Sequence, residues 1–211
     1  MMELILGSQS PRRRELLERM GLQFRVLSAE IDETNYKTDD PETTVRRICE
    51  AKATAVERIL RSAENDCLQD TLILSSDTIV VLDGTIMGKP RDEAEACAML
   101  AALSGREHAV YTAFCLLPIQ HAARSVQKAM CHCEKTYVKF RTLSPEEIEA
   151  YVSTGEPMDK AGAYGIQNLG AMLVESIRGD YFTVMGLPVC QLALALKAFG
   201  IDPLRKQEKA Q

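Results

Sequence analysis

The chain has 211 residues, of which 46% are hydrophobic and 26% are charged, as is usual for a globular protein with one sizeable core. Its net charge of -5 argues against a general affinity for nucleic acid, because binding to phosphate backbones requires a basic surface. No apolar run approaches the roughly 20 residues that span a bilayer, and the amino terminus lacks the layout of a secretory signal. We therefore expect a cytoplasmic protein without membrane or nucleic-acid partners, with one domain over residues 1–204 and a flexible tail over 205–211.

Seven cysteines are an odd number for a chain without an export signal, which favours reduced thiols over a disulfide framework. The run Cys131-His132-Cys133 has two interpretations. Zinc is one, but a finger or ribbon needs a second pair of ligands at a suitable spacing. The alternation of Met130, His132 and Glu134 with the two cysteines is typical of a β-strand, and we favour the strand.

Hydrophobic periodicity in the first third of the chain predicts two strands and two helices. Ser10 and Pro11 supply an N-cap and a first-turn proline for the first helix. The second helix carries Val45 and Ile48 on one apolar face. The predicted elements are a strand over 3–8, a helix from 10 to about 21, a strand over 24–28, an acidic loop over 29–40 and a helix from 41 to about 65.

The remainder of the chain mixes hairpin-linked strands with helices. Asp83-Gly84 between two β-prone runs is the clearest hairpin signal. The predicted elements are strands over 71–75, 79–82, 85–87, 108–117, 126–140 and 171–177, helices over 91–103, 144–152 and 187–199, and a loop over 155–170. This order predicts an α/β protein with a mixed sheet.

Two of the predicted helices begin with Ser-Pro and then differ in charge. Ser144-Pro-Glu-Glu places carboxylates at the positive end of the helix, and Glu147 completes a capping box. The helix that follows Ser10 instead begins with three arginines, residues 12–14. Exposed, flexible arginines explain this at a cost of about 0.3–1 kcal/mol each. An anion site built from Ser8, free helix N–H groups and guanidinium groups explains it equally well, and both interpretations stay open.

Two further segments have both a functional and an ordinary interpretation. Asp77 follows the predicted strand over 71–75, where ligands bind in open α/β sheets, or it is a polar residue that opens the hairpin. The glycine-rich segment 155–170 is either a surface loop or a ligand-binding loop, in which the Gln167 amide can donate to and accept from a base edge. The sequence has no Gly-x-x-x-x-Gly-Lys-Ser/Thr motif, which excludes a Walker P-loop.

Five motifs in chain order resemble those of the Maf-like family: Ser8-Gln-Ser-Pro-Arg-Arg13, Ser76-Asp-Thr78, Gly88-Lys-Pro90, Leu103-Ser-Gly105 and Glu156-Pro-Met-Asp-Lys-Ala-Gly-Ala-Tyr-Gly-Ile-Gln167. The resemblance spans nearly the whole chain, and the last motif is the most specific. It implies an α/β fold like that of the inosine triphosphate pyrophosphatases, an elongated mixed β-sheet with flanking helices and two lobes around a cleft. It also implies a single catalytic domain that hydrolyses nucleoside triphosphates to the monophosphate and pyrophosphate with Mg²⁺ or Mn²⁺.

The matching motif positions imply roles for individual residues. Asp77 resembles the proton acceptor that activates water, and Asp77 with Glu33 resembles the metal-binding pair, although Glu30 and Asp32 are near neighbours of Glu33. The residues Arg12, Thr78 and Gln167 resemble those that set base specificity. The expected catalytic side chains are Asp77, Lys52 and Lys89, and the expected substrate-binding ones are Ser8, Arg12, Arg13, Thr78, Lys160 and Gln167.

Thr78 after Asp77, with the final motif, is similar to the branch of the family that acts on dTTP and UTP. The alternatives are a 7-methyl-GTP pyrophosphatase of the same fold and a nucleotide-binding regulator of cell division without turnover. Two departures from the family pattern are Gly7, where alanine is usual, and a longer stretch around 62–69. The sequence leaves open whether the chain forms a homodimer.

Overall fold

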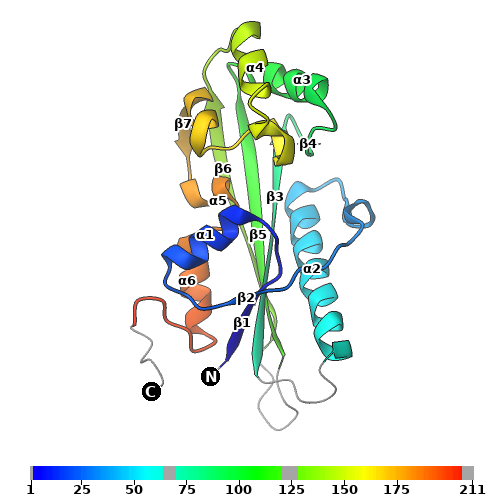
Figure 1. The fold of residues 1–211 in the computed structure, drawn as a ribbon, viewed down its shortest axis with the longest axis vertical. Helices are drawn as coiled ribbons and strands as arrows, with labels where there is room; N and C mark the ends of the chain where they lie inside the picture. Colours follow the sequence, from blue (N-terminus) through cyan, green and yellow to red (C-terminus); the bar gives the residue numbers. More distant parts are fainter. Residues whose placement is uncertain (1, 64–69, 120–127, 206–211) are drawn as a thin grey trace.

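A mixed β-sheet runs the length of the molecule, with helices on both of its faces (Figure 1). The computed structural model describes residues 2–63, 70–119 and 128–205, and within these the sheet has seven strands. The spatial order is β2-β1-β3-β5-β6-β7, with β4 paired to β3. The strands are β1 (Glu3–Leu6), β2 (Arg25–Val26), β3 (Thr71–Leu82), β4 (Thr85–Met87), β5 (Glu107–Ile119), β6 (Met130–Phe140) and β7 (Val174–Arg178).

The α-helices cover both faces of the sheet, and on one face they form two groups, one at each end of the molecule (Figure 1). The longest one, α2, lies along one face, while α1 and α6 cover the other face near the amino terminus and α3 and α4 cover the far end. The α-helices are α1 (Pro11–Arg19), α2 (Pro41–Ala63), α3 (Glu93–Leu103), α4 (Pro145–Val152), α5 (Tyr181–Met185) and α6 (Val189–Lys197). Short 3-10 helices are η1 (Glu33–Tyr36), η2 (Glu156–Asp159), η3 (Ala161–Ala163) and η4 (Asn168–Leu173).

Strand β3 is the central strand, and one of its edges is only partly paired. Parallel β1 covers residues 71–74 of that edge, ending at the pair Leu6↔Leu74, and antiparallel β4 covers residues 80–82. Residues 75–79 therefore lie beside no strand of the described chain on this edge, whereas β5 pairs with the opposite edge from Thr71 to Val81. The consequence is an opening in the sheet edge at the middle of β3.

Side chains of β3 alternate between the two faces, as the period of a strand requires. Leu72 and Leu74 pack on one face in the core beneath α1 and α6. Ile73 packs on the other face against the apolar side of α2. Farther along, Val80 and Leu82 belong to a separate core beneath α3 and α4. Two lobes therefore stand on one face of the sheet, one on either side of the opening in β3.

Helix α2 forms where the sequence places apolar residues at helical spacing. Val45, Cys49, Val56 and Leu60 are all buried, and each buried aliphatic side chain of this size contributes about 1.5–3 kcal/mol. Asp40 Oδ2 accepts a hydrogen bond of 2.9 Å from the amide of Thr43 at the start of the helix. This helix supplies one wall of the site described below.

Most predicted elements are confirmed, with differences at their ends. The hairpin, the strand over Cys131-His132-Cys133 and the capping box of Ser144 and Glu147 are present. The strand expected over 24–28 is reduced to two residues, and the loop over 155–170 contains η2, η3 and the start of η4. Helix α5 was not predicted. The tail residues 206–211, residues 64–69 of the longer stretch and residues 126–127 of the strand predicted over 126–140 lie outside the described residues.

One prediction about β3 is wrong. The strand expected to end at Ser75 continues to Leu82, so Asp77 lies in the middle of a strand and not after its end. The polar residues that led to the prediction of a strand end have their hydroxyl groups hydrogen-bonded to distant parts of the chain. Ser75 Oγ donates to the carbonyl of Cys49 at 2.7 Å, and Ser76 Oγ donates to that of Gly186 at 3.0 Å. In the described residues, no helix is long and apolar enough to cross a membrane.

Candidate active site

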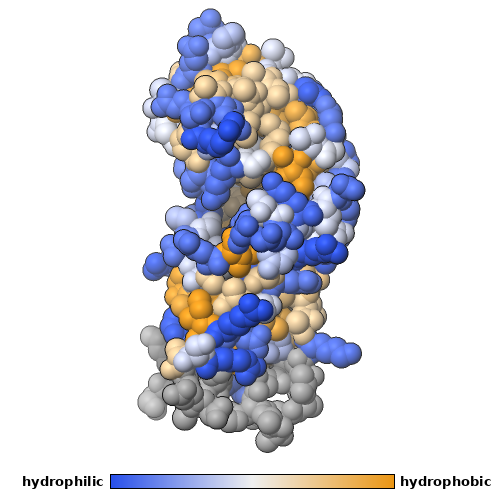
Figure 2. All heavy atoms as spheres, turned by 90° about the vertical axis from the view of Figure 1, so that its right-hand side faces the viewer, coloured by the Kyte–Doolittle hydropathy of each residue, from blue (hydrophilic) through white to orange (hydrophobic). Residues whose placement is uncertain are grey.

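A cleft of about 860 Å³ lies at the opening in β3, and Figure 2 shows a hollow between the upper and lower halves of the surface. Six cationic side chains and four carboxylates line this cleft. All ten residues proposed for the site from the sequence are among its lining residues: Ser8, Arg12, Arg13, Glu33, Lys52, Asp77, Thr78, Lys89, Lys160 and Gln167. The structure thus brings together side chains from both ends of the chain.

Neighbouring residues of β3 reach the cleft from opposite faces of the sheet. Asp77 faces α2, where it meets Lys52, whereas Thr78 faces α1 and hydrogen-bonds to Arg13 at 3.2 Å. In a continuous sheet these two faces are separated by the neighbouring strand. Because β1 ends at Leu6, the cleft passes around the open edge of β3 and reaches both side chains.

Asp77 and Lys52 form the most buried ion pair of the cleft. Lys52 Nζ lies 2.6 Å from Asp77 Oδ1 and 2.7 Å from Glu33 Oε1. Burial raises the pKa of Asp77 above its ordinary value, and the positive charges of Lys52 and Arg13 oppose that shift. Burial alone lowers the pKa of Lys52, but attraction to Asp77 and then Glu33 raises it overall. Asp77 is therefore a carboxylate with increased proton affinity beside a lysine that stays charged.

Arg13 turns inward from the first turn of α1. Its guanidinium donates hydrogen bonds to Ser8 Oγ at 3.0 Å, to Thr78 Oγ1 at 3.2 Å and to the carbonyl of Gly186 at 2.9 Å. Burial lowers the pKa of Arg13, and the negative charge of Asp77 opposes this shift. A fixed positive charge held by three neutral oxygens keeps most of its attraction for an added anion.

The glycine-rich segment places a second group of charges across the cleft. Lys160 Nζ lies 2.6 Å from Asp159 Oδ1 and donates to the carbonyl of Glu156 at 2.5 Å. Arg12 reaches the other oxygen of Asp159 at 3.4 Å. Burial raises the pKa of Asp159, but Lys160 and then Arg12 lower it overall. These contacts link the start of α1 to the loop, and the two together form one wall of the cleft.

Lys89 reaches the cleft from the end of the β4 hairpin, and it is exposed. The backbone of this segment is fixed to the glycine-rich loop, since the amide of Gly162 donates to the carbonyl of Gly88 at 3.0 Å. Gly162 has a φ of 69°, and a Cβ there would lie 2.9 Å from Val80 Cγ1. Glycine is required at this position for both its conformation and its closeness to β3.

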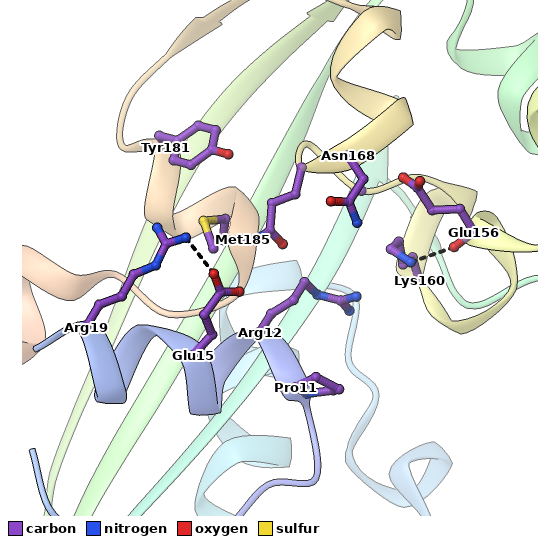
Figure 3. A pocket seen from close by; sticks show the side chains of 11 residues that line it. Pro11, Arg12, Glu15, Arg19, Glu156, Lys160, Asn168, Tyr181 and Met185 are labelled. Carbon is purple, nitrogen blue, oxygen red and sulfur yellow. Dashed lines mark hydrogen bonds and ion pairs between the residues drawn. The ribbon is translucent and has the colours of Figure 1, made fainter.

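A smaller cavity of about 460 Å³ adjoins the cleft at the start of α1 (Figure 3). On one side α1 presents the ion pair of Glu15 and Arg19, at 2.5 Å, and Tyr181 of α5 lies on the other side. Arg12 and Gln167 line both cavities. The Gln167 amide makes no hydrogen bond to any part of the chain that the structure describes, so it is available to a ligand.

Asp77 and Glu33 fit the expected metal site, because their oxygens converge on the ammonium group of Lys52. Mg²⁺ is commonly held by one or two protein carboxylates, with phosphate and water oxygens completing its coordination. Within residues 2–63, 70–119 and 128–205, no group of three or more His, Cys, Asp or Glu side chains is placed to hold an ion. Asp77 and Glu33 would supply the one or two carboxylates of such a site.

Comparison with known proteins identifies the family of this chain. The family model described as Maf-like protein matches residues 3–199, which is most of the chain and includes the whole cleft. The chain belongs to the Maf-like family.

Three relatives of the Maf-like chain match it over nearly its whole length, and each is named dTTP/UTP pyrophosphatase. The protein from Moorella thermoacetica is 48% identical over 96% of this chain and 97% of its own. That from Symbiobacterium thermophilum is 46% identical over 95% of each chain. That from Syntrophomonas wolfei is 44% identical over 96% of this chain and 100% of its own.

Several groups of the Maf-like cleft were not anticipated from the sequence. The carbonyl of Gly186 accepts from both Arg13 and Ser76, and Lys37 adds a charge to the cleft wall. Glu30, the neighbour of Glu33 named from the sequence, also lines the cleft. Gly186 ends helix α5, which has only five residues and therefore little periodicity. The signal that could have indicated α5 is Asp180, whose carboxylate caps the amides of residues 182 and 183.

Proposed function

We propose that this Maf-like protein is a nucleoside triphosphate pyrophosphatase that hydrolyses dTTP and UTP to the monophosphate and pyrophosphate. Relatives named dTTP/UTP pyrophosphatase at 44–48% identity over nearly the full length support the substrate class. The observation that carries the reaction is the partly buried ion pair of Asp77 and Lys52, whose Oδ1 and Nζ atoms are 2.6 Å apart, in a cleft lined by further cations. Such a site offers a base beside fixed positive charge, which is what phosphoryl transfer requires.

In the proposed reaction, Asp77 accepts a proton from a water molecule as its oxygen attacks the α-phosphorus. The bond from that phosphorus to the oxygen bridging the α- and β-phosphates breaks, and pyrophosphate leaves with the bonding electron pair. The raised pKa of Asp77 supports this role, because a carboxylate of higher pKa accepts a proton more readily. Lys52 keeps Asp77 in place and remains charged near the reacting phosphate.

The other cations are proposed to bind the phosphate chain. Arg13 and Ser8 lie together at the start of α1, Lys160 lies on the facing loop, and Lys89 extends from the hairpin. Interactions of this kind stabilise the negative charge that moves onto the departing pyrophosphate. Neutralisation of phosphate charge is also the chemistry that a divalent cation, Mg²⁺ or Mn²⁺, supplies when bound at Asp77 and Glu33.

Base selection is proposed to involve Arg12, Thr78 and Gln167. The Gln167 amide is unpaired within the described chain and can pair with the O4 and N3–H groups that uracil and thymine share. Cytosine presents the opposite pattern of donor and acceptor at this edge. A site that bonds one edge rejects the other, because the mismatch leaves buried polar groups unpaired.

Residues 1–204 are proposed to act as one catalytic domain in the cytoplasm. The six cysteines that the structure describes are all free thiols, which is usual in a reducing compartment. Both lobes contribute residues to the cleft, so neither lobe alone contains a complete site.

The decisive experiment is to measure pyrophosphate release from a panel of nucleoside triphosphates with Mg²⁺, with Mn²⁺ and with EDTA. We expect turnover of UTP and dTTP that EDTA abolishes. Turnover of 7-methyl-GTP alone would show that the protein is a 7-methyl-GTP pyrophosphatase and not a dTTP/UTP pyrophosphatase. Nucleotide binding without pyrophosphate release under either cation would instead indicate a regulator, and the proposed reaction would be refuted.

A further inference from the structure

Gln167 belongs to a segment whose backbone is held on both sides by the side chains of two residues outside β3 and α1. These are Tyr151, at the buried end of α4, and Glu156, at the start of η2. The Tyr151 hydroxyl donates to Glu156 Oε1 at 3.0 Å and accepts from the amide of Gly165 at 3.3 Å. The carboxylate of Glu156 also accepts from the amides of Leu169 and Gly170, at 3.2 and 3.1 Å.

These four hydrogen bonds fix the backbone two residues before Gln167 and two and three residues after it. We call the pair of Tyr151 and Glu156 the loop clasp. Burial raises the pKa of the Tyr151 hydroxyl, so this group stays protonated and able to donate. Between the fixed points, Asn168 has a left-handed φ of 48°, a conformation that asparagine adopts more readily than most residues.

The packing within the clasp leaves little room for another arrangement. A Cβ at Gly170 would lie 2.1 Å from the carbonyl oxygen of Gly165 and 2.7 Å from the Tyr151 hydroxyl. The two glycines on either side of Gln167 therefore approach each other closely across the clasp, and a side chain at position 170 would separate them. The segment between them is a tight loop of defined shape.

The clasp is not what attaches the loop to the protein. Tyr164 is buried in the core beneath α3 and α4, where its hydroxyl lies 2.7 Å from His108 Nε2. Ile166 is buried in the other core, beneath α1 and α6. These two anchors remain when a clasp hydrogen bond is removed, so the loop is expected to stay folded while the path of residues 165–170 relaxes.

We propose that Tyr151 and Glu156 are positioning residues for base selection, which hold the backbone around Gln167 so that its amide meets the uracil edge in one orientation. This inference rests on the proposed function. Glu156 lines the smaller cavity but not the cleft that contains Asp77, and Tyr151 lines neither cavity. Their effect on the reaction is therefore expected in the choice of base more than in the rate of the chemical step.

The experiment compares kcat/KM for UTP and for CTP in Tyr151→Phe, which keeps the ring and removes the hydroxyl, and in Glu156→Gln. In Glu156→Gln an NH₂ group replaces one acceptor and faces backbone N–H donors. We expect the ratio of UTP to CTP activity to fall about tenfold in Tyr151→Phe and further in Glu156→Gln, with kcat for CTP within about threefold of the parent. Tyr137→Phe removes a hydroxyl from β6 outside both cavities and should leave the ratio unchanged.

A second measurement separates positioning from general destabilisation. In a Gln167→Ala background the base reader is absent, so adding Tyr151→Phe should leave the UTP to CTP ratio unchanged. Clasp variants that keep the parent ratio, that lose both activities equally, or that still change the ratio without Gln167 would each overturn the inference. A parent enzyme that releases no pyrophosphate would refute the proposed function itself, whereas a parent that prefers UTP and clasp variants with the same UTP to CTP ratio would refute only the role of the clasp.

Discussion

Replacement of Asp77 by asparagine is the most direct test of the proposed chemistry. The change keeps the size of the side chain and removes its charge and its ability to accept a proton. We expect kcat for UTP to fall by about 10²-fold or more, equivalent to at least about 2.7 kcal/mol in activation free energy. Stability should change by only about 1 kcal/mol, because Lys52 keeps Glu33 at 2.7 Å and the new amide oxygen still accepts its hydrogen bond.

The two effects are measured separately, by pyrophosphate release and by urea denaturation. Asp83→Asn is the matched control, because it is the same substitution just beyond the end of β3, where Asp83 pairs with Arg106 outside the cleft. The control should keep parent activity. If Asp77→Asn retains more than about a tenth of the parent kcat, Asp77 is not the proton acceptor. If it unfolds, the residual contact of Lys52 with Glu33 does not compensate for the lost charge.

Three further outcomes follow from individual side chains. Gln167→Glu removes the donor to O4 of uracil, so UTP hydrolysis should fall more than CTP hydrolysis, and equal losses would show that Gln167 does not read the base. Burial lowers the pKa of His108 to about 4, so stability present above about pH 6.5 is lost as pH falls toward 4. Denaturation of His108→Phe at pH 7 and pH 5 should therefore show a difference between the two pH values about 2 kcal/mol smaller than in the parent, whereas identical differences would contradict a buried neutral imidazole. Ser144→Ala removes the acceptor for the Glu147 amide and should cost about 1 kcal/mol in urea denaturation, with activity unchanged; no loss of stability would mean that this cap does not support α4.

The three arginines at the start of α1 show which contacts local sequence rules can predict and which they cannot. The two interpretations of this run were exposed arginines and an anion site, and the structure sends the residues in three directions. Arg14 pairs with Glu18 on the surface at 2.9 Å, Arg12 reaches Asp159, and Arg13 turns inward to the carbonyl of Gly186. Successive helical residues point about 100° apart, so one run can serve several purposes. Asp159 and Gly186 lie 147 and 173 residues from the arginines that they bind, and no local pattern predicts these contacts.

The central strand β3 shows a case in which the local sequence predicted the wrong structure. Its end was predicted from the polar residues at 75–78, which in isolation favour a turn. Those residues stay extended because β5 pairs with them along one edge and distant carbonyls accept their hydroxyl groups. Long-range pairing therefore overrode local composition. The motif order still located the site, since all ten proposed residues line one cleft, although their roles are proposals.

Strands β3 and β5 form one continuous antiparallel ladder beneath both lobes, which is paired from Thr71↔Ile119 to Val81↔Ala109. In proteins that close over a ligand by hinge motion, the lobes usually rotate about a few loop residues. In this protein such a rotation would have to bend the hydrogen-bonded ladder of β3 and β5. We therefore expect little movement of one lobe toward the other when a ligand binds. We expect the long exposed side chains at the cleft entrance, such as Lys89, to adjust to a ligand more than Asp77, which lies within the paired central strand.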